Sequence, residues 1–91
     1  MKSAVRIKVK GRVQGVGYRW FAVNTAKDFS INGYVQNLPD GNVEIYAEGD
    51  DSRLLLFIEK LREGPPFSNV IDIVSDYESF KDRFNKFQVR Y

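Results

Sequence analysis

The stretch from Gly11 to Arg19 reads GRVQGVGYR, so three glycines fall within seven residues and an arginine closes the run. Before it, residues 4–10 alternate between apolar and basic side chains, which predicts a half-buried strand. After it, apolar side chains recur at helical spacing from Tyr18 to Phe29 and predict a helix of about three turns. A glycine-rich turn between a strand and a helix lets backbone N–H groups converge on an anion, so this stretch is a candidate anion-binding loop.

Outward from this loop, the sequence predicts one more helix and further strands. The strands are expected at residues 34–38, 43–48 and 70–74, with a short final strand at 87–91. The second helix should run from candidate N-caps at 50–52 to the stop Gly64-Pro65-Pro66, with an apolar face of Leu54, Leu55, Ile58 and Leu61. Asn32-Gly33 is expected to end the first helix or to form a turn, and Pro39–Asn42 to form a hairpin turn. Residues 76–86 are polar with scattered aromatics and receive no assignment.

The order strand, helix, strand, strand, helix, strand predicts an α+β fold, organised as one domain over residues 1–91. It is the ferredoxin-like α/β sandwich (βαββαβ), with two helices on one face of a largely antiparallel sheet of four to five strands. The first and third strands are then central antiparallel neighbours, and the second runs parallel to the first, one position further out. Their carboxyl ends share one edge of the sheet. Asn37 should therefore meet the glycine-rich loop, although it lies 18 positions after Arg19.

The same topology predicts how charges are distributed on the face that the helices leave uncovered. Arg6, Lys8 and Lys10 should lie there beside Glu44, Tyr46 and Glu48 of the neighbouring strand. Each cross-strand pair of opposite charges is worth only about 0.2–1 kcal/mol. We therefore interpret the basic row as a paired sheet face rather than as a binding surface.

Composition excludes several kinds of chemistry. The 91 residues contain no cysteine and no histidine and carry a formal net charge of +2. The chain thus has no thiolate nucleophile, disulfide framework or imidazole base, and its weak, interspersed charge does not argue for nucleic acid. The N-terminal residues lack the apolar core of a signal peptide, and no stretch approaches the length of a membrane span. A cytoplasmic monomer that binds no membrane is the expectation.

Two polar residues could complete an anion site at the loop. The guanidinium of Arg19 can donate two parallel hydrogen bonds to phosphate oxygens. Asn37 occupies a strand position where asparagine is depleted, and its amide can both accept from and donate to one water molecule. Each has a plainer interpretation: Arg19 as a solvated helix residue, and Asn37 as the residue that opens the turn at Pro39.

Two stretches of this chain resemble the sequence signatures of a known enzyme family. The stretch GRVQGVGYR resembles the signature of the acylphosphatase family, and Gly33–Glu44, GYVQNLPDGNVE, resembles the family's second signature. The spacing of the two motifs and the Phe-x-Val-x-Tyr ending also match, so the resemblance covers nearly the whole chain. It implies the same ferredoxin-like fold and the hydrolysis of acyl phosphates to a carboxylate and inorganic phosphate. No cofactor and no metal are expected.

The resemblance also implies roles for individual residues. Arg19 matches the arginine that binds phosphate, and Asn37 matches the asparagine that orients the attacking water. Leu38 stands where some members carry a hydroxyl residue, so a hydrogen bond from that site to the loop should be missing. The cradle whose main-chain N–H groups hold the phosphoryl oxygens is matched by Gly15, Val16, Gly17, Tyr18 and Arg19.

The implied chemistry explains why no histidine is needed. The leaving group is a carboxylate whose conjugate acid has a pKa of about 4, so it departs without being protonated. Phosphoryl transfer through a loose transition state needs mainly positioning and stabilisation of charge. Our hypothesis is that the proton of the water passes to a phosphoryl oxygen of the substrate. The expected partners are a small-molecule acyl phosphate and inorganic phosphate, the latter as product and competitive inhibitor.

Two alternatives come from other functional classes. Small ferredoxin-like domains often bind single-stranded RNA by stacking bases on exposed sheet aromatics. Here the only candidate is Tyr46, which is flanked by Glu44 and Glu48, and these carboxylates would repel a phosphate backbone. No nucleic-acid partner is therefore expected. The other alternative is a non-catalytic anion-binding or regulatory domain, which would bind phosphate without turnover.

Overall fold

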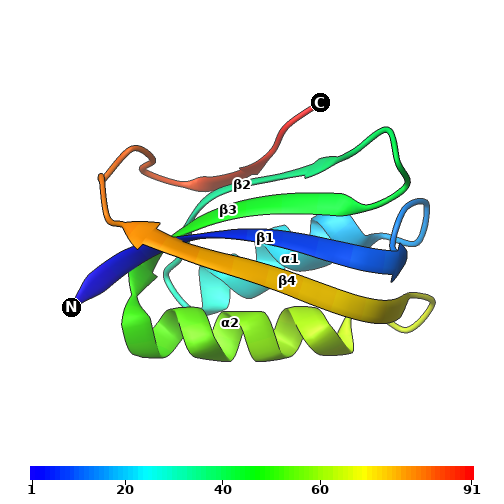
Figure 1. The fold of residues 1–91 in the computed structure, drawn as a ribbon, viewed down its shortest axis with the longest axis horizontal. Coiled ribbons are helices and arrows are strands. Elements are labelled where there is room, and N and C mark those ends of the chain that lie inside the picture. Colours follow the sequence, from blue (N-terminus) through cyan, green and yellow to red (C-terminus); the bar gives the residue numbers. More distant parts are fainter.

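The computed structural model describes residues 1–91 and has the predicted order of elements, ending on a short fifth strand (Figure 1). The elements are β1 (Lys2–Arg12), α1 (Tyr18–Asp28), β2 (Asn32–Asn37), β3 (Val43–Asp50), α2 (Asp51–Glu63), β4 (Asn69–Ser79) and β5 (Phe87–Val89). Neither helix is long and apolar enough to cross a bilayer.

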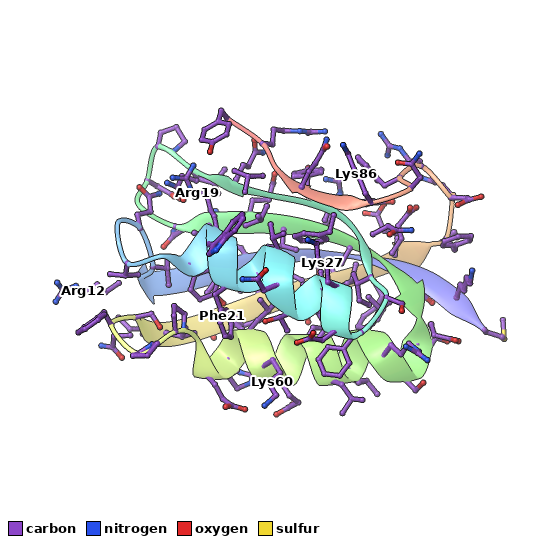
Figure 2. All side chains as sticks on the ribbon, turned by 180° about the vertical axis from the view of Figure 1, so that it is seen from behind. Arg12, Arg19, Phe21, Lys27, Lys60 and Lys86 are labelled. Atoms are coloured by element: carbon purple, nitrogen blue, oxygen red, sulfur yellow. The ribbon has the colours of Figure 1, made fainter.

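The sheet has the predicted topology. Its strand order is β4-β1-β3-β2-β5, with β1 and β3 as antiparallel neighbours and β2 antiparallel to β3. β2 is therefore parallel to β1 and one position further out. Helix α1 lies behind the strands in Figure 1 and in front of them in Figure 2, with α2 alongside it, so both helices cover the same face. The ferredoxin-like α/β sandwich is confirmed.

The core lies between this face of the sheet and the helices. Val5, Ile7 and Val9 of β1 are buried as the alternation predicts, and each such side chain stabilises the fold by about 1.5–3 kcal/mol. The apolar face predicted for α2 is wrong at Leu55, whose side chain is 61% exposed, whereas Phe57 is fully buried. The reason is helical geometry, because Phe57 lies three residues after Leu54 and on the same face.

Two sequence assignments differ from the structure near the middle and the end of the chain. Asn32-Gly33 lies inside β2 and does not end α1, which stops at Asp28 before a left-handed turn at Ser30 (φ 56°). Gly33 is required in β2 because a Cβ there would collide with the carbonyl oxygen of Tyr46. At the other end, β4 continues to Ser79, because its residues as far as Ser79 pair with β1.

The face opposite the helices is not uncovered, contrary to expectation. Phe84 packs on the stacked rings of Tyr34 and Tyr46, with ring centroids 5.8 and 5.5 Å away, and Tyr46 is only 1% exposed. The physical reason is connectivity: β4 and β5 are at opposite edges of the sheet, so the segment between them must cross the other strands. Because Tyr46 is buried, it offers no platform for stacking RNA bases.

The basic row of β1 lies on this face, as predicted, but its partners come from elsewhere. Arg6 lies opposite Tyr46 in the β1–β3 register, with its guanidinium 5.0 Å from the ring centroid. It forms an ion pair of 3.0 Å with Glu78 of β4, on the other side. Lys8 pairs at 3.4 Å with Asp40, in the β2–β3 turn. The ion pairs therefore reach β4 and the turn, instead of joining β1 to the carboxylates of β3.

Glu48 of β3 holds in place the segment that crosses the sheet between β4 and β5. Its carboxylate is 2% exposed and accepts hydrogen bonds from the backbone N–H groups of Arg83 (3.0 Å) and Phe84 (3.2 Å). Hydrogen bonds to a charged acceptor are worth about 1.5–3 kcal/mol each. This carboxylate was expected at the surface, and it instead fixes the segment that buries Tyr46.

We expect the Glu48→Ala protein to lose about 2–4 kcal/mol of unfolding free energy, because two N–H groups lose a charged acceptor. Glu48→Gln, which keeps one acceptor oxygen, should lose less. Urea denaturation followed by circular dichroism measures both, with the exposed Glu59→Ala as the matched control. Equal midpoints for Glu48→Ala and Glu59→Ala would show that Glu48 does not hold the segment.

Candidate active site

The β1–α1 loop presents open backbone at the start of α1. Gly15 and Gly17 have left-handed φ angles of 73° and 80°, which favour glycine, and no atom lies within 4 Å of where a Cβ would stand at either. The first intrahelical bond runs from the N–H of Phe21 to the carbonyl of Gly17 (3.0 Å). The N–H groups of Tyr18, Arg19 and Trp20 therefore have no acceptor within the helix. No side chain caps this end, and the first turn contains no acidic residue.

The side chain of Tyr18 anchors this end of α1 to the protein interior. It is buried, and its hydroxyl donates to the carbonyl oxygen of Leu61 near the end of α2, at 2.6 Å. Burial raises the pKa of the Tyr18 hydroxyl, so it remains a protonated donor at ordinary pH. Tyr18 thus supplies only its backbone to the open side of the loop.

Gln14 ties the loop to the β2–β3 turn. Its side-chain amide donates to the carbonyl oxygens of Leu38 and Asn42, both at 2.8 Å. The sequence led us to expect no hydrogen bond from position 38 to the loop, because leucine has no hydroxyl. The backbone of Leu38 makes one instead. A polar residue between the apolar Val13 and Val16 was the available signal for this tether.

The turn that receives Gln14 is itself held by Asp40. One carboxylate oxygen of Asp40 accepts from the backbone N–H of Asn42 at 3.0 Å, and the other lies 3.4 Å from the ammonium of Lys8. The hydrogen bond from the Asn42 backbone, aided by Lys8, lowers the pKa of the Asp40 carboxyl. Asp40 therefore stays ionised, and keeps the turn closed, to lower pH than an ordinary aspartate would.

The loop, α1, β2 and the C-terminal segment together line a cavity of about 180 Å³. The lining residues are Val13, Gly15, Gly17, Tyr18, Arg19, Trp20, Asn37, Val89 and Tyr91. Every predicted site residue except Val16 is among them, and Val16 packs against the core. The expected meeting of Asn37 with the loop is therefore found, and it follows from β1 and β2 ending at the same edge.

Asn37 and Arg19 each bring to this cavity a polar group that is not paired within the protein. The side-chain oxygen of Asn37 is buried and has no hydrogen-bond partner. Arg19 forms no ion pair, and its guanidinium lies 5.2 Å from the ring centroid of Tyr91. Figure 2 shows Arg19 at the start of α1, below the C-terminal end of the chain. Since no aspartate or glutamate lines the cavity, no acidic side chain there competes with an anion for the positive charge of Arg19.

Sequence reasoning missed the apolar part of the lining, which includes Trp20, Val89 and Tyr91. No local signal in the sequence gives this placement, because it depends on how the last strand pairs. β5 runs parallel to β2 with Val89 opposite Val35, so two residues further on Tyr91 comes level with Asn37. Alternation predicted the short strand but not the edge of the sheet to which it would add.

Comparisons with known proteins identify the family to which the chain is similar. The model of the acylphosphatase family matches residues 5–89. A curated acylphosphatase from Thermotoga petrophila is 41% identical over 89 residues, which cover 98% of each chain. Another, from Archaeoglobus fulgidus, is 43% identical over 84 residues, which cover 86% of this chain and 94% of the relative. The crystal structure of acylphosphatase from Bacillus subtilis is 41% identical, covers 100% of both chains and has a TM-score of 0.95.

With the fold, the two sequence motifs and these relatives in agreement, the chain belongs to the acylphosphatase family of enzymes.

Proposed function

We propose that the chain hydrolyses the carboxyl–phosphate bond of acyl phosphates by direct attack of water on phosphorus. One observation carries the proposal: an unpaired guanidinium, an open glycine loop and a buried, unpartnered amide oxygen line one cavity. These groups have different tasks in the reaction. Arg19 and the loop hold the phosphoryl group, and Asn37 orients the water.

The phosphoryl group is bound by charge and by directed N–H groups. The backbone N–H groups from Gly15 to Arg19 form the cradle, and the two left-handed glycines keep side chains out of the way of the anion. Arg19 adds a forked donor whose charge no acidic side chain in the cavity compensates. Such preorganised donors stabilise the transition state most strongly where water is excluded.

The attacking water is held by Asn37. Its side-chain oxygen can accept one hydrogen of the water and thereby direct a lone pair of the water oxygen at phosphorus. The gain comes from orientation, since an amide is far too weak a base to remove a proton. The tether from Gln14 keeps the loop in register with the turn that follows Asn37, and so keeps the cradle and the water site together.

The bond changes balance without a protein acid or base. The water oxygen forms a bond to phosphorus while the bond from phosphorus to the acyl oxygen breaks, and the carboxylate leaves with the electron pair. One proton of the water stays on the new hydroxyl, and the other passes to a phosphoryl oxygen. The cavity lining contains no aspartate, glutamate, histidine or cysteine, so this donor set favours a reaction without a metal. One copy of the chain supplies every group, so we expect a monomer to be active.

This mechanism predicts strong selectivity for the leaving group. The protein should hydrolyse benzoyl phosphate in the presence of EDTA, with inorganic phosphate as a competitive inhibitor. Ethyl phosphate should react with a kcat/KM at least about 1000-fold lower, because its alkoxide cannot leave unprotonated. Release of phosphate measures both rates. Phosphate binding without turnover of benzoyl phosphate would instead identify a non-catalytic anion-binding domain.

A further inference from the structure

Beside the phosphoryl cradle, the cavity has apolar lining residues that come from separate parts of the chain. Trp20 comes from the first turn of α1, and Val89 and Tyr91 come from the C-terminal segment beside β2. Arg19 is flanked by both parts, because it precedes Trp20 in sequence and lies against the ring of Tyr91. The cavity lining therefore combines polar groups with apolar side chains that lie next to them.

The two aromatic rings among these apolar lining residues do little for the fold. Trp20 is 66% exposed and Tyr91 is 99% exposed, although rings of this size are usually the best core formers. The buried face of α1 is made by other residues, including Ala22 and Ala26. Stability does not account for two exposed aromatic rings beside the phosphoryl cradle, whereas contact with a ligand does.

An acyl phosphate has the matching shape, with a charged head and, across the carbonyl, an organic group. When the phosphoryl group is in the cradle, that organic group must extend beyond the cradle. We propose that Trp20, Val89 and Tyr91 bind the acyl group, and that the enzyme prefers aromatic or long aliphatic acyl phosphates to acetyl phosphate. This inference rests on the proposed function and adds the substrate class to it.

The charges around the cavity exclude other acyl groups. Arg19 is the only lining residue whose side chain is charged at neutral pH, and its task is to bind the phosphoryl group. No side-chain carboxylate lines the cavity to receive an aminoacyl group. A second carboxylate on the acyl chain would meet apolar surface and would lose hydration without a partner. Neutral, apolar acyl groups are therefore the class that this surface fits.

The first test compares benzoyl phosphate with acetyl phosphate and uses the ratio of their kcat/KM values, which cancels effects common to both substrates. In the Trp20→Ala protein this ratio should fall by about 3- to 10-fold relative to wild type, since an aromatic contact is lost. Trp20→Phe should restore part of it. Leu55→Ala is the matched control, because Leu55 is 61% exposed on the outer face of α2 and should leave the ratio unchanged. An unchanged ratio in folded Trp20→Ala would overturn the inference.

The second test does not depend on turnover. Trp20 is the only tryptophan of the chain, so intrinsic fluorescence reports directly on this surface. Phenylphosphonate should bind more tightly than methylphosphonate and should perturb the emission, and calorimetry should find the preference weakened in Trp20→Ala. Equal affinity of the two phosphonates would overturn the inference while leaving the proposed function intact. Preferential binding of phenylphosphonate without hydrolysis of either acyl phosphate would support the surface and contradict the reaction.

Discussion

The Arg19→Ala protein is expected to hydrolyse benzoyl phosphate with a kcat/KM about 100- to 1000-fold below that of wild type. Arg19 has the only charged side chain that lines the cavity, and this side chain forms no ion pair. Its removal leaves the developing negative charge of the phosphoryl oxygens to the backbone N–H groups alone. Arg19→Lys should recover part of the rate, because it restores the charge without the forked geometry. Initial rates at several substrate concentrations give kcat and KM for each protein.

Arg12 provides the matched control for this substitution. It ends β1 just before the same loop, and its side chain is exposed and points away from the molecule in Figure 2. Arg12→Ala should therefore keep kcat/KM within about twofold of wild type. Circular dichroism and urea denaturation establish that both variants are folded. If folded Arg19→Ala and Arg12→Ala were equally active, Arg19 would not bind the phosphoryl group.

The Asn37→Ala protein is expected to lose about 100-fold in kcat, because the water is no longer held in line with phosphorus. KM should change little, since the phosphoryl group is bound by other residues. Stability offers an independent readout. The oxygen of Asn37 is buried without a partner, so its removal should not lower the unfolding free energy. A loss of activity with unchanged or higher stability is the signature of a residue retained for function.

The exposed Asn24 of α1 is the control for this second substitution, and Asn24→Ala should keep full activity. Asn37→Asp adds a further distinction. It preserves shape but places a negative charge beside the phosphoryl group, so it should weaken substrate binding as well as turnover. A wild-type kcat in folded Asn37→Ala would contradict the assignment of the water to Asn37.

The parts of this structure that were predictable from sequence depend on local periodicity. The alternation through Val5, Ile7 and Val9 is a property of one strand, and the order of the elements then restricts the topology to a ferredoxin-like sandwich. The meeting of the glycine loop with Asn37 follows from that topology alone. The polar half of the site was therefore predictable as soon as the strands were arranged in a sheet.

The parts that were not predictable depend on segments that lie far apart in sequence. Tyr46 and Glu48 alternate as sheet-face residues should, but their burial depends on the crossing of residues 80–86, which have no periodicity of their own. The tether from Gln14 ends on backbone carbonyls, which leave no trace in the side-chain pattern. Tyr91 reaches the cavity only because β5 adds to β2 in parallel.

The separate roles proposed for Arg19 and Asn37 are tested most directly by measuring how inorganic phosphate binds. Calorimetric titration of wild type, Arg19→Ala and Asn37→Ala separates holding the phosphoryl group from orienting the water. Asn37→Ala should bind phosphate as wild type does although it has lost turnover, and Arg19→Ala should lose both. Wild-type phosphate affinity in Arg19→Ala, or lost affinity in Asn37→Ala, would contradict the account.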